Sequence, residues 1–186
     1  MRNFVAKSLT NVFKWTADTF FARRYGHRAV VLETVAGVPP MVAGMMMHLK
    51  SLRKMDDRGP YIAKMLAEAE NERMHLMFFM EITKPTWFER WLVVGAQFVF
   101  WHFYLLLYIA SPKTAHRMVA YFEKEAVNSY TEYLRMVEAG EVDNVACPQI
   151  AIDYYDLPAD ATLADLIRNV REDEKKHCRV NRWISL

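Results

Sequence analysis

The chain has 186 residues, 53% of them hydrophobic and 13% aromatic, with a formal net charge of +2. This length predicts one domain over residues 1–186 with a sizeable core. The near balance of interleaved charges argues against a nucleic-acid partner. The two cysteines, Cys147 and Cys178, are too few for a disulfide framework and fit no zinc motif.

The apolar pattern predicts an all-α chain, because no stretch shows the sustained alternation of a β-strand. Pro39-Pro40 predict a kink or a helix end inside the second helix, since an interior proline costs about 3 kcal/mol. The segment 140–160, with one glycine and two prolines, predicts a loop. The six predicted helices cover residues 9–25, 27–54, 60–83, 87–110, 113–139 and 161–183.

Two of these helices have features of helices that lie on a membrane surface. The helix at 9–25 mixes phenylalanines with basic residues, and the helix at 87–110 contains an uncharged run from Trp91 to Ser111. A run of this length can span a bilayer, lie in one leaflet or form a buried core helix. Gln97 and His102 lie within it, and polar groups are disfavoured in hydrocarbon.

Four glutamates and two histidines have the spacing of a two-metal site. Two Glu-x-x-His pairs occur on separate helices, and residues three apart share one face of a helix. A four-helix bundle holds two iron or manganese ions with two such pairs and one glutamate from each of two further helices. Carboxylate oxygens suit oxidised metal ions, and imidazole completes each coordination sphere. The candidate ligands are Glu33, Glu72, His75, Glu123, Glu174 and His177.

Solvated glutamates and core histidines are the alternative explanation of this spacing. Glu33 lies in the apolar run Val30–Ala36, where a bare carboxylate needs either a metal ion or a basic partner. Arg28 and Arg73 are the candidate partners for a structural salt bridge to Glu33.

At these residues the chain strongly resembles the alternative oxidases, including their plastid relatives. The resemblance extends from about Tyr25 to Asn181. Its motifs are Leu32-Glu33-Thr34, Asn71–His75, Glu123–Ala126 followed by Tyr130, and Asp173–His177.

This resemblance implies a ferritin-like four-helix bundle with a non-haem di-iron centre. The helices at about 9–25 and 87–110 would lie on the membrane surface of a monotopic homodimer, and the six candidate ligands would bind the two irons. Tyr130 would be a redox-active tyrosine near the metals. Quinol would bind at Arg28, Leu32, Glu125, Ala126 and Ser129, and the polar residues around the ligands would be Asn71, Asp173 and Tyr154.

The implied activity is that of a ubiquinol:oxygen oxidoreductase. Two quinols would pass four electrons to oxygen and give water, without proton pumping and without inhibition by cyanide. The resemblance implies the matrix side of the mitochondrial inner membrane or the cytoplasmic side of a bacterial inner membrane. The rival functions are an iron carrier without a lipid-facing helix, a quinone-biosynthesis hydroxylase and a metal-free membrane-surface scaffold.

The chain departs from the family pattern at several positions, none of them a candidate ligand. Phe122, Lys124 and Ser129 stand where the family usually has leucine, glutamate and threonine. Phe122 and Ser129 belong to the implied quinone pocket, so we expect an altered substrate or inhibitor preference. Tyr155 replaces a tryptophan beside Tyr154.

Overall fold

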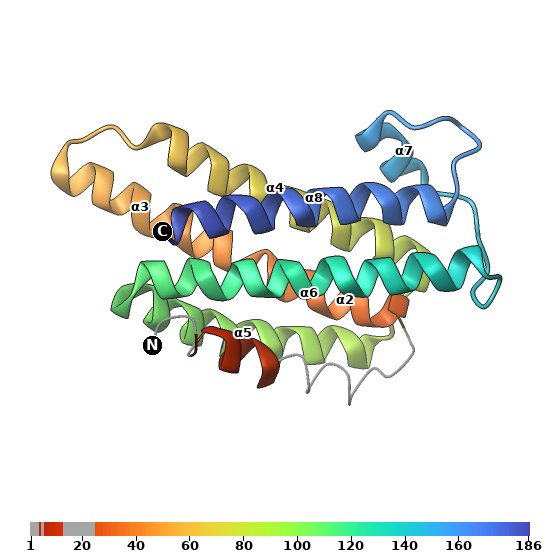
Figure 1. Cartoon of the computed structure of the whole chain (residues 1–186), viewed down its shortest axis with the longest axis horizontal. Coiled ribbons are helices and arrows are strands. Elements are labelled where there is room, and N and C mark those ends of the chain that lie inside the picture. The colour runs from red at the N-terminus through yellow and green to blue at the C-terminus, as the bar shows by residue number, and fades with distance from the viewer. Residues whose placement is uncertain (1–3, 5, 13–24) are drawn as a thin grey trace. The chain divides into compact units, whose positions relative to one another are not determined.

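A computed structural model of the chain describes residues 4, 6–12 and 25–186 (Figure 1). The ordered elements in these ranges are helices, apart from one isolated bridge between Ala146 and Thr162, so the all-α prediction is confirmed. Residues 9–12 of the predicted first helix are helical, and its residues 13–24 lie outside the described part. The helices are α2 (Tyr25–Ala36), α3 (Val38–Lys54), α4 (Gly59–Thr83), α5 (Trp87–Ala110), α6 (Pro112–Glu138), α7 (Gln149–Tyr155) and α8 (Leu163–Ile184).

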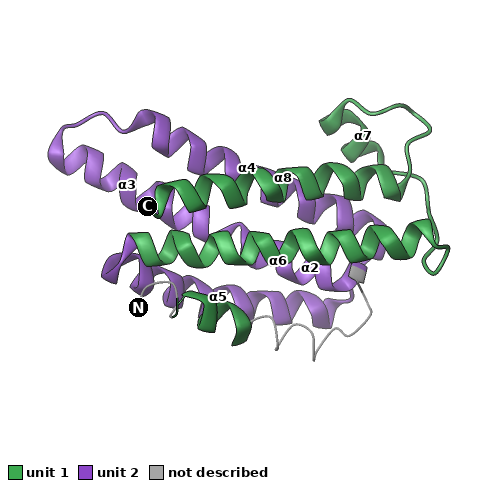
Figure 2. Cartoon of the chain, viewed as in Figure 1, with its two compact units in different colours: residues 1–25, 113–186 green, residues 26–112 purple. Residues whose placement is uncertain are grey.

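The chain divides into two compact units (Figure 2). Unit 1 comprises residues 1–25 and 113–186, and it contains α7, α8 and almost all of α6. Unit 2 comprises residues 26–112 and contains α3, α4, α5 and almost all of α2. The single domain over residues 1–186 stays a prediction.

In unit 2 the predicted second helix is two helices, α2 and α3, which meet at Gly37. Pro39 and Pro40 lie in the first turn of α3. The first turn of a helix leaves its N–H groups without intrahelical acceptors, so proline is tolerated there. The predicted helix end at this pair is therefore confirmed. Helix α3 packs on α4 and α5, and a Cβ at Gly44 would lie 3.4 Å from the Cβ of Met65.

Helix α5 begins with a capping box between Thr86 and Glu89. Glu89 also binds α2, because its Oε1 lies 2.7 Å from His27 Nδ1. Further along α5, Gln97 Nε2 donates to the carbonyl oxygen of Thr34 over 2.9 Å. Polar side chains of α5 thus attach this apolar helix to α2 at two points.

The opposite face of α5 is exposed and apolar. Only 17% of the most apolar 18-residue stretch of α5 is buried, so a buried core helix is the wrong interpretation of this run. By length and composition alone, α5 and the stretch of α2 and α3 (residues 26–54) are each long and apolar enough to cross a membrane. Half of the most apolar part of the 26–54 stretch is buried. The exposed large side chains of α5 include Trp87, Phe88, Trp91, Val94, Phe98, Val99, Leu106 and Ile109.

In unit 1, α6 and α8 lie side by side and antiparallel. Cys178 Sγ donates to the carbonyl oxygen of Ala120 over 3.2 Å, and Arg168 pairs with Glu138 at 2.6 Å, near the opposite end of α6. Burial of one large apolar side chain stabilises a fold by about 1.5–3 kcal/mol. The apolar residues that these two helices bury include Met118, Val119, Leu134, Val137, Leu163, Leu166, Ile167 and Val170.

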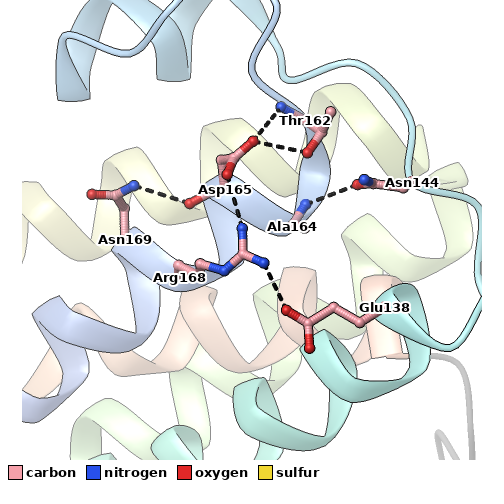
Figure 3. A network of polar contacts seen from close by, with 7 residues as sticks. All are labelled: Glu138, Asn144, Thr162, Ala164, Asp165, Arg168 and Asn169. Carbon is pink, nitrogen blue, oxygen red and sulfur yellow. Dashed lines mark hydrogen bonds and ion pairs between the residues drawn. The ribbon is translucent and has the colours of Figure 1, made fainter.

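The prediction of a loop over residues 140–160 is wrong for Gln149–Tyr155, which form α7. Pro148 precedes the helix and Asp156 ends it in the left-handed conformation (φ 53°), while Ala151 is fully buried. Asn144 lies earlier in this segment, and its Oδ1 accepts a hydrogen bond from the Ala164 N–H in the first turn of α8 (Figure 3).

Candidate metal centre

In unit 2, two helices bring three candidate ligands together. Glu33 lies on α2, and Glu72 and His75 lie on α4. The Nδ1 atom of His75 lies 3.6 Å from Glu33 Oε2 and 3.6 Å from Glu72 Oε2, and one ligand atom of each residue lies within 4.8 Å of the others. The side chains are 5%, 1% and 0% exposed, respectively. We call this group the unit 2 triad.

The junction of α2 and α3 accounts for this arrangement. Gly37 directly follows α2, and its N–H donates to the carbonyl oxygen of Glu33 over 3.4 Å. A Cβ on Gly37 would lie 3.7 Å from the Cβ of Glu72. The end of α2 therefore lies against the ligand-bearing turn of α4.

A salt bridge between Glu33 and Arg73, one of the alternatives to a metal ion, is wrong. Arg73 Nη2 pairs with Glu70 Oε1 at 2.6 Å, and Arg73 Nε donates to Glu70 Oε2 over 2.8 Å. Both of these side chains are more than half exposed, so this pair lies on the surface of α4.

Unit 1 holds a second group of the same composition. Glu123 lies on α6, and Glu174 and His177 lie one helical turn apart on α8. One ligand atom of each residue lies within 4.8 Å of the others. All three residues are buried, with exposed fractions of 5%, 1% and 8%. We call this group the unit 1 triad.

The donor chemistry of each triad fits a divalent or trivalent cation. Two carboxylate oxygens at 4.8 Å repel each other by about 3.5 kcal/mol at an effective dielectric constant of about 20, and burial removes the water that would screen them. A single imidazolium would neutralise only one of the two carboxylates. Two carboxylates with one imidazole form a mixed oxygen and nitrogen donor set that suits iron or manganese. The buried Glu/His groups are therefore candidate metal-binding residues.

The neighbour of Glu174, Asp173, is bound at both carboxylate oxygens. The Tyr155 hydroxyl donates to its Oδ2 over 2.8 Å, and Lys176 Nζ donates to its Oδ1 over 2.8 Å. From the sequence, Tyr154 was predicted to lie near the metal ligands, and the hydrogen bond from Tyr155 to Asp173 was not predicted. Tyr154 is 42% exposed and packs its ring edge-on against the ring of Tyr155. The substitution of Tyr155 for tryptophan was the only sequence signal at that position.

A second polar link lies one turn beyond His177. Asn181 Nδ2 donates to the carbonyl oxygen of His177 over 3.2 Å, and His116 Nδ1 lies 2.7 Å from Asn181 Oδ1. An amide oxygen only accepts hydrogen bonds, so Nδ1 of His116 carries the proton. Burial lowers the pKa of His116 below its ordinary value, and the hydrogen bond with Asn181 offsets only part of that effect. Sequence reasoning did not identify this pair.

The remaining site predictions lie on the same helices as the triads. Tyr130 is buried on α6, seven residues and thus two turns after Glu123, and Asn71 is half-buried beside Glu72 on α4. The predicted quinol residues divide between the units. Arg28 and Leu32 lie on α2, and Glu125, Ala126 and Ser129 lie on α6.

The chain is similar over most of its length to proteins named ubiquinol oxidases. The chain is 54% identical to ubiquinol oxidase 1c, mitochondrial, of Arabidopsis thaliana over 97% of its length and 55% of the relative. It is 56% identical to ubiquinol oxidase 1a, mitochondrial, of Oryza sativa subsp. japonica over 92% of its length and 52% of the relative. The chain thus spans about half the length of the curated relatives it matches.

The sequence profile described as "Alternative oxidase" matches residues 1–185, which is almost the whole chain and includes both triads. The six candidate ligands, their burial and this match agree with one another, and the chain belongs to the alternative oxidase family.

Proposed function

We propose that this chain is a quinol oxidase that reduces oxygen to water at a di-iron centre formed by the two triads. The observation that carries the proposal is the pair of buried Glu/Glu/His groups, one in each unit. Each triad would hold one iron ion, and the bound metal would supply the redox chemistry. The relatives named ubiquinol oxidases support a quinol as the electron donor.

The overall reaction balances with two quinols for each oxygen molecule. Each quinol gives up two electrons and two protons and becomes a quinone, and the four electrons and four protons reduce one oxygen molecule to two waters. The protein's part is to orient the quinol and to exclude bulk water. Proton pumping is not expected, and activity should resist cyanide.

For the quinol we propose a site formed by Arg28, Leu32, Glu125, Ala126 and Ser129, with Tyr130 as the redox-active tyrosine beside the metals. Arg28 precedes Glu33 by five residues on α2, and Tyr130 is buried on the ligand helix α6. A guanidinium and a carboxylate are groups that bind quinol oxygens. Asn71, Asp173 and Tyr154 would lie around the ligands. Phe122 and Ser129 would adjust the preference for substrate or inhibitor.

The proposal places the enzyme on a membrane, with the exposed apolar face of α5 in one leaflet. A helix that lies in the interface plane buries its apolar face about 5–10 Å into the lipid. Trp87, Phe88 and Trp91 expose large aromatic rings on α5, as such a helix requires. By analogy with its relatives, whose names include the word mitochondrial, we propose the matrix side of the mitochondrial inner membrane; a bacterial inner membrane is the alternative.

A homodimer is part of the proposal. Helix α3 exposes Met41, Met45, Leu49 and Leu52 at a spacing of three or four residues, so they form one apolar stripe. A second copy of the chain can cover this stripe, as isologous dimers do. We expect Leu52→Glu to lower the mass measured by light scattering in detergent from that of two chains to that of one. An unchanged mass would contradict this choice of surface.

Oxygen uptake driven by a short-chain quinol in the presence of cyanide tests the main proposal. Glu72→Ala removes a buried ligand, so we expect loss of iron and of cyanide-resistant uptake. Glu70→Ala is the matched control, because Glu70 lies on the same helix but is exposed and paired with Arg73. A Glu72→Ala protein with full iron content and full activity would refute the assignment of the ligands.

A further inference from the structure

Tyr155 lies outside both triads, but its hydroxyl reaches the turn of α8 that carries Glu174 and His177. It donates to Asp173 Oδ2 over 2.8 Å, and Lys176 binds the other oxygen of the same carboxylate over 2.8 Å. The Asp173 side chain is 12% exposed. Two elements, α7 and α8 itself, therefore hold the residue that directly precedes the ligand Glu174.

The segment that carries Tyr155 is attached to α8 at a second place. The Leu163 N–H donates to the carbonyl oxygen of Val145 over 2.8 Å, and the Cys147 N–H donates to that of Ala161 over 2.9 Å. These bonds lie at the start of α8 or just before it, whereas the Tyr155 contact lies about 15 Å further along this helix. Loss of the Tyr155 hydroxyl would leave these two backbone hydrogen bonds intact, so the segment should stay folded.

Hydrogen bonds around metal ligands set the orientation of those ligands, and removal of one typically lowers metal affinity about 10- to 100-fold. The backbone of Asp173 continues directly into Glu174, and His177 follows one turn later. A carboxylate that is held at both oxygens resists rotation and fraying of this turn. The hydrogen-bond donor of Tyr155, rather than its ring, carries this effect.

We propose that Tyr155 is a positioning residue for the unit 1 triad. Its hydroxyl, acting through Asp173, keeps the turn of α8 in place so that Glu174 and His177 retain their metal ion. The inference rests on the proposed function, since it takes the triad to be a metal site. It adds a role for α7, a helix that contributes no candidate ligand.

Metal retention tests the proposal without recourse to oxidase activity. The purified full chain is loaded with Co(II), whose visible spectrum reports its coordination, and release to a chelator is followed over time. We expect Tyr155→Phe to release the metal about tenfold faster and to change the Co(II) spectrum. Tyr155→Trp should restore slow release, because an indole N–H can replace the phenol as donor. Tyr121→Phe, on α6, is the matched control and should behave as wild type.

Asp173→Ala provides a second, independent variant, because alanine has no acceptor for the Tyr155 hydroxyl. If the two residues act through one hydrogen bond, the double variant Tyr155→Phe/Asp173→Ala should release metal no faster than the faster single variant. Release from Tyr155→Phe at the wild-type rate, with a wild-type spectrum, would overturn the positioning role and leave the metal centre standing. A wild-type chain that binds no Co(II) or iron would instead overturn the proposed function, and this inference with it.

Discussion

His116 is a buried histidine outside both triads, and it provides a test at the scale of a single residue. Its exposed fraction is 1%, and burial lowers its pKa below the ordinary value. The folded chain therefore binds a proton at this site less readily than the unfolded chain. Stability that depends on neutral His116 is present above the unfolded pKa, near 6.5, and is lost as the pH falls below it.

We expect the free energy of unfolding of the metal-free protein to fall by up to about 1 kcal/mol from this residue between pH 7 and pH 5.5. His116→Asn removes the titrating group and keeps an N–H near the position of Nδ1 that can donate to Asn181 Oδ1. Urea unfolding of both proteins at several pH values measures the difference. Parallel pH profiles for the two proteins would contradict the assignment of this effect to His116.

At the scale of elements, the start of α8 depends on side chains from two segments. Thr162 and Asp165 form a capping box, and Asn144 Oδ1 accepts a hydrogen bond from the Ala164 N–H over 3.0 Å (Figure 3). Arg168 then joins Asp165 to Glu138 of α6. The first N–H groups of a helix have no intrahelical acceptors, so these contacts satisfy groups that would otherwise need water.

Asn144→Ala removes one of these acceptors, and we expect it to destabilise the chain by about 1 kcal/mol. For a chain of this size, that corresponds to a decrease in Tm of about 2–4 °C. Calorimetry or circular dichroism measures the shift. Asn128→Ala, on the exposed surface of α6, is the matched control, and an equal decrease in Tm in both variants would argue against the capping role.

At the scale of the whole molecule, the exposed face of α5 determines how the protein meets a lipid surface. Its Trp91 is 66% exposed. A charged side chain in place of this ring would lose apolar burial and add a cost of desolvation. We therefore expect Trp91→Glu to lower the fraction of protein bound to liposomes, with an affinity reduced at least about tenfold.

Flotation of liposomes with bound protein measures this fraction. Trp183→Glu is the control, because Trp183 is 74% exposed but belongs to α8. Equal losses of binding in the two variants would show that any exposed tryptophan contributes, and would contradict a specific role of α5.

Local sequence was sufficient for most of the helices and for placing two Glu-x-x-His pairs on them; the role of these residues as ligands stays a prediction. Helices α4 and α5 begin and end within one residue of their predicted bounds, because Pro60, Pro85 and Pro112 interrupt the apolar pattern near their ends. Glu72/His75 and Glu174/His177 follow from a spacing of three, which depends only on helical geometry. The burial of all four residues agrees with their prediction as ligands.

Features that join distant segments could not be predicted in this way. Helix α7 has only seven residues, too few to be stable alone, and a fully buried Ala151 anchors it. Tyr155 and Asp173 are eighteen residues apart, and His116 and Asn181 are sixty-five apart. Neither pair has a local pattern that would indicate its contact.

The amino-acid sequence by itself determined the helical class, the two Glu-x-x-His pairs and the apolar character of α5, because these depend on spacing and composition along one helix. Only the tertiary structure decided that α5 leaves its apolar face exposed, that Arg73 binds Glu70, and that the Tyr155 hydroxyl donates to Asp173. Those outcomes depend on which helix faces pack together, and this is settled by the whole set of buried contacts rather than by any one segment.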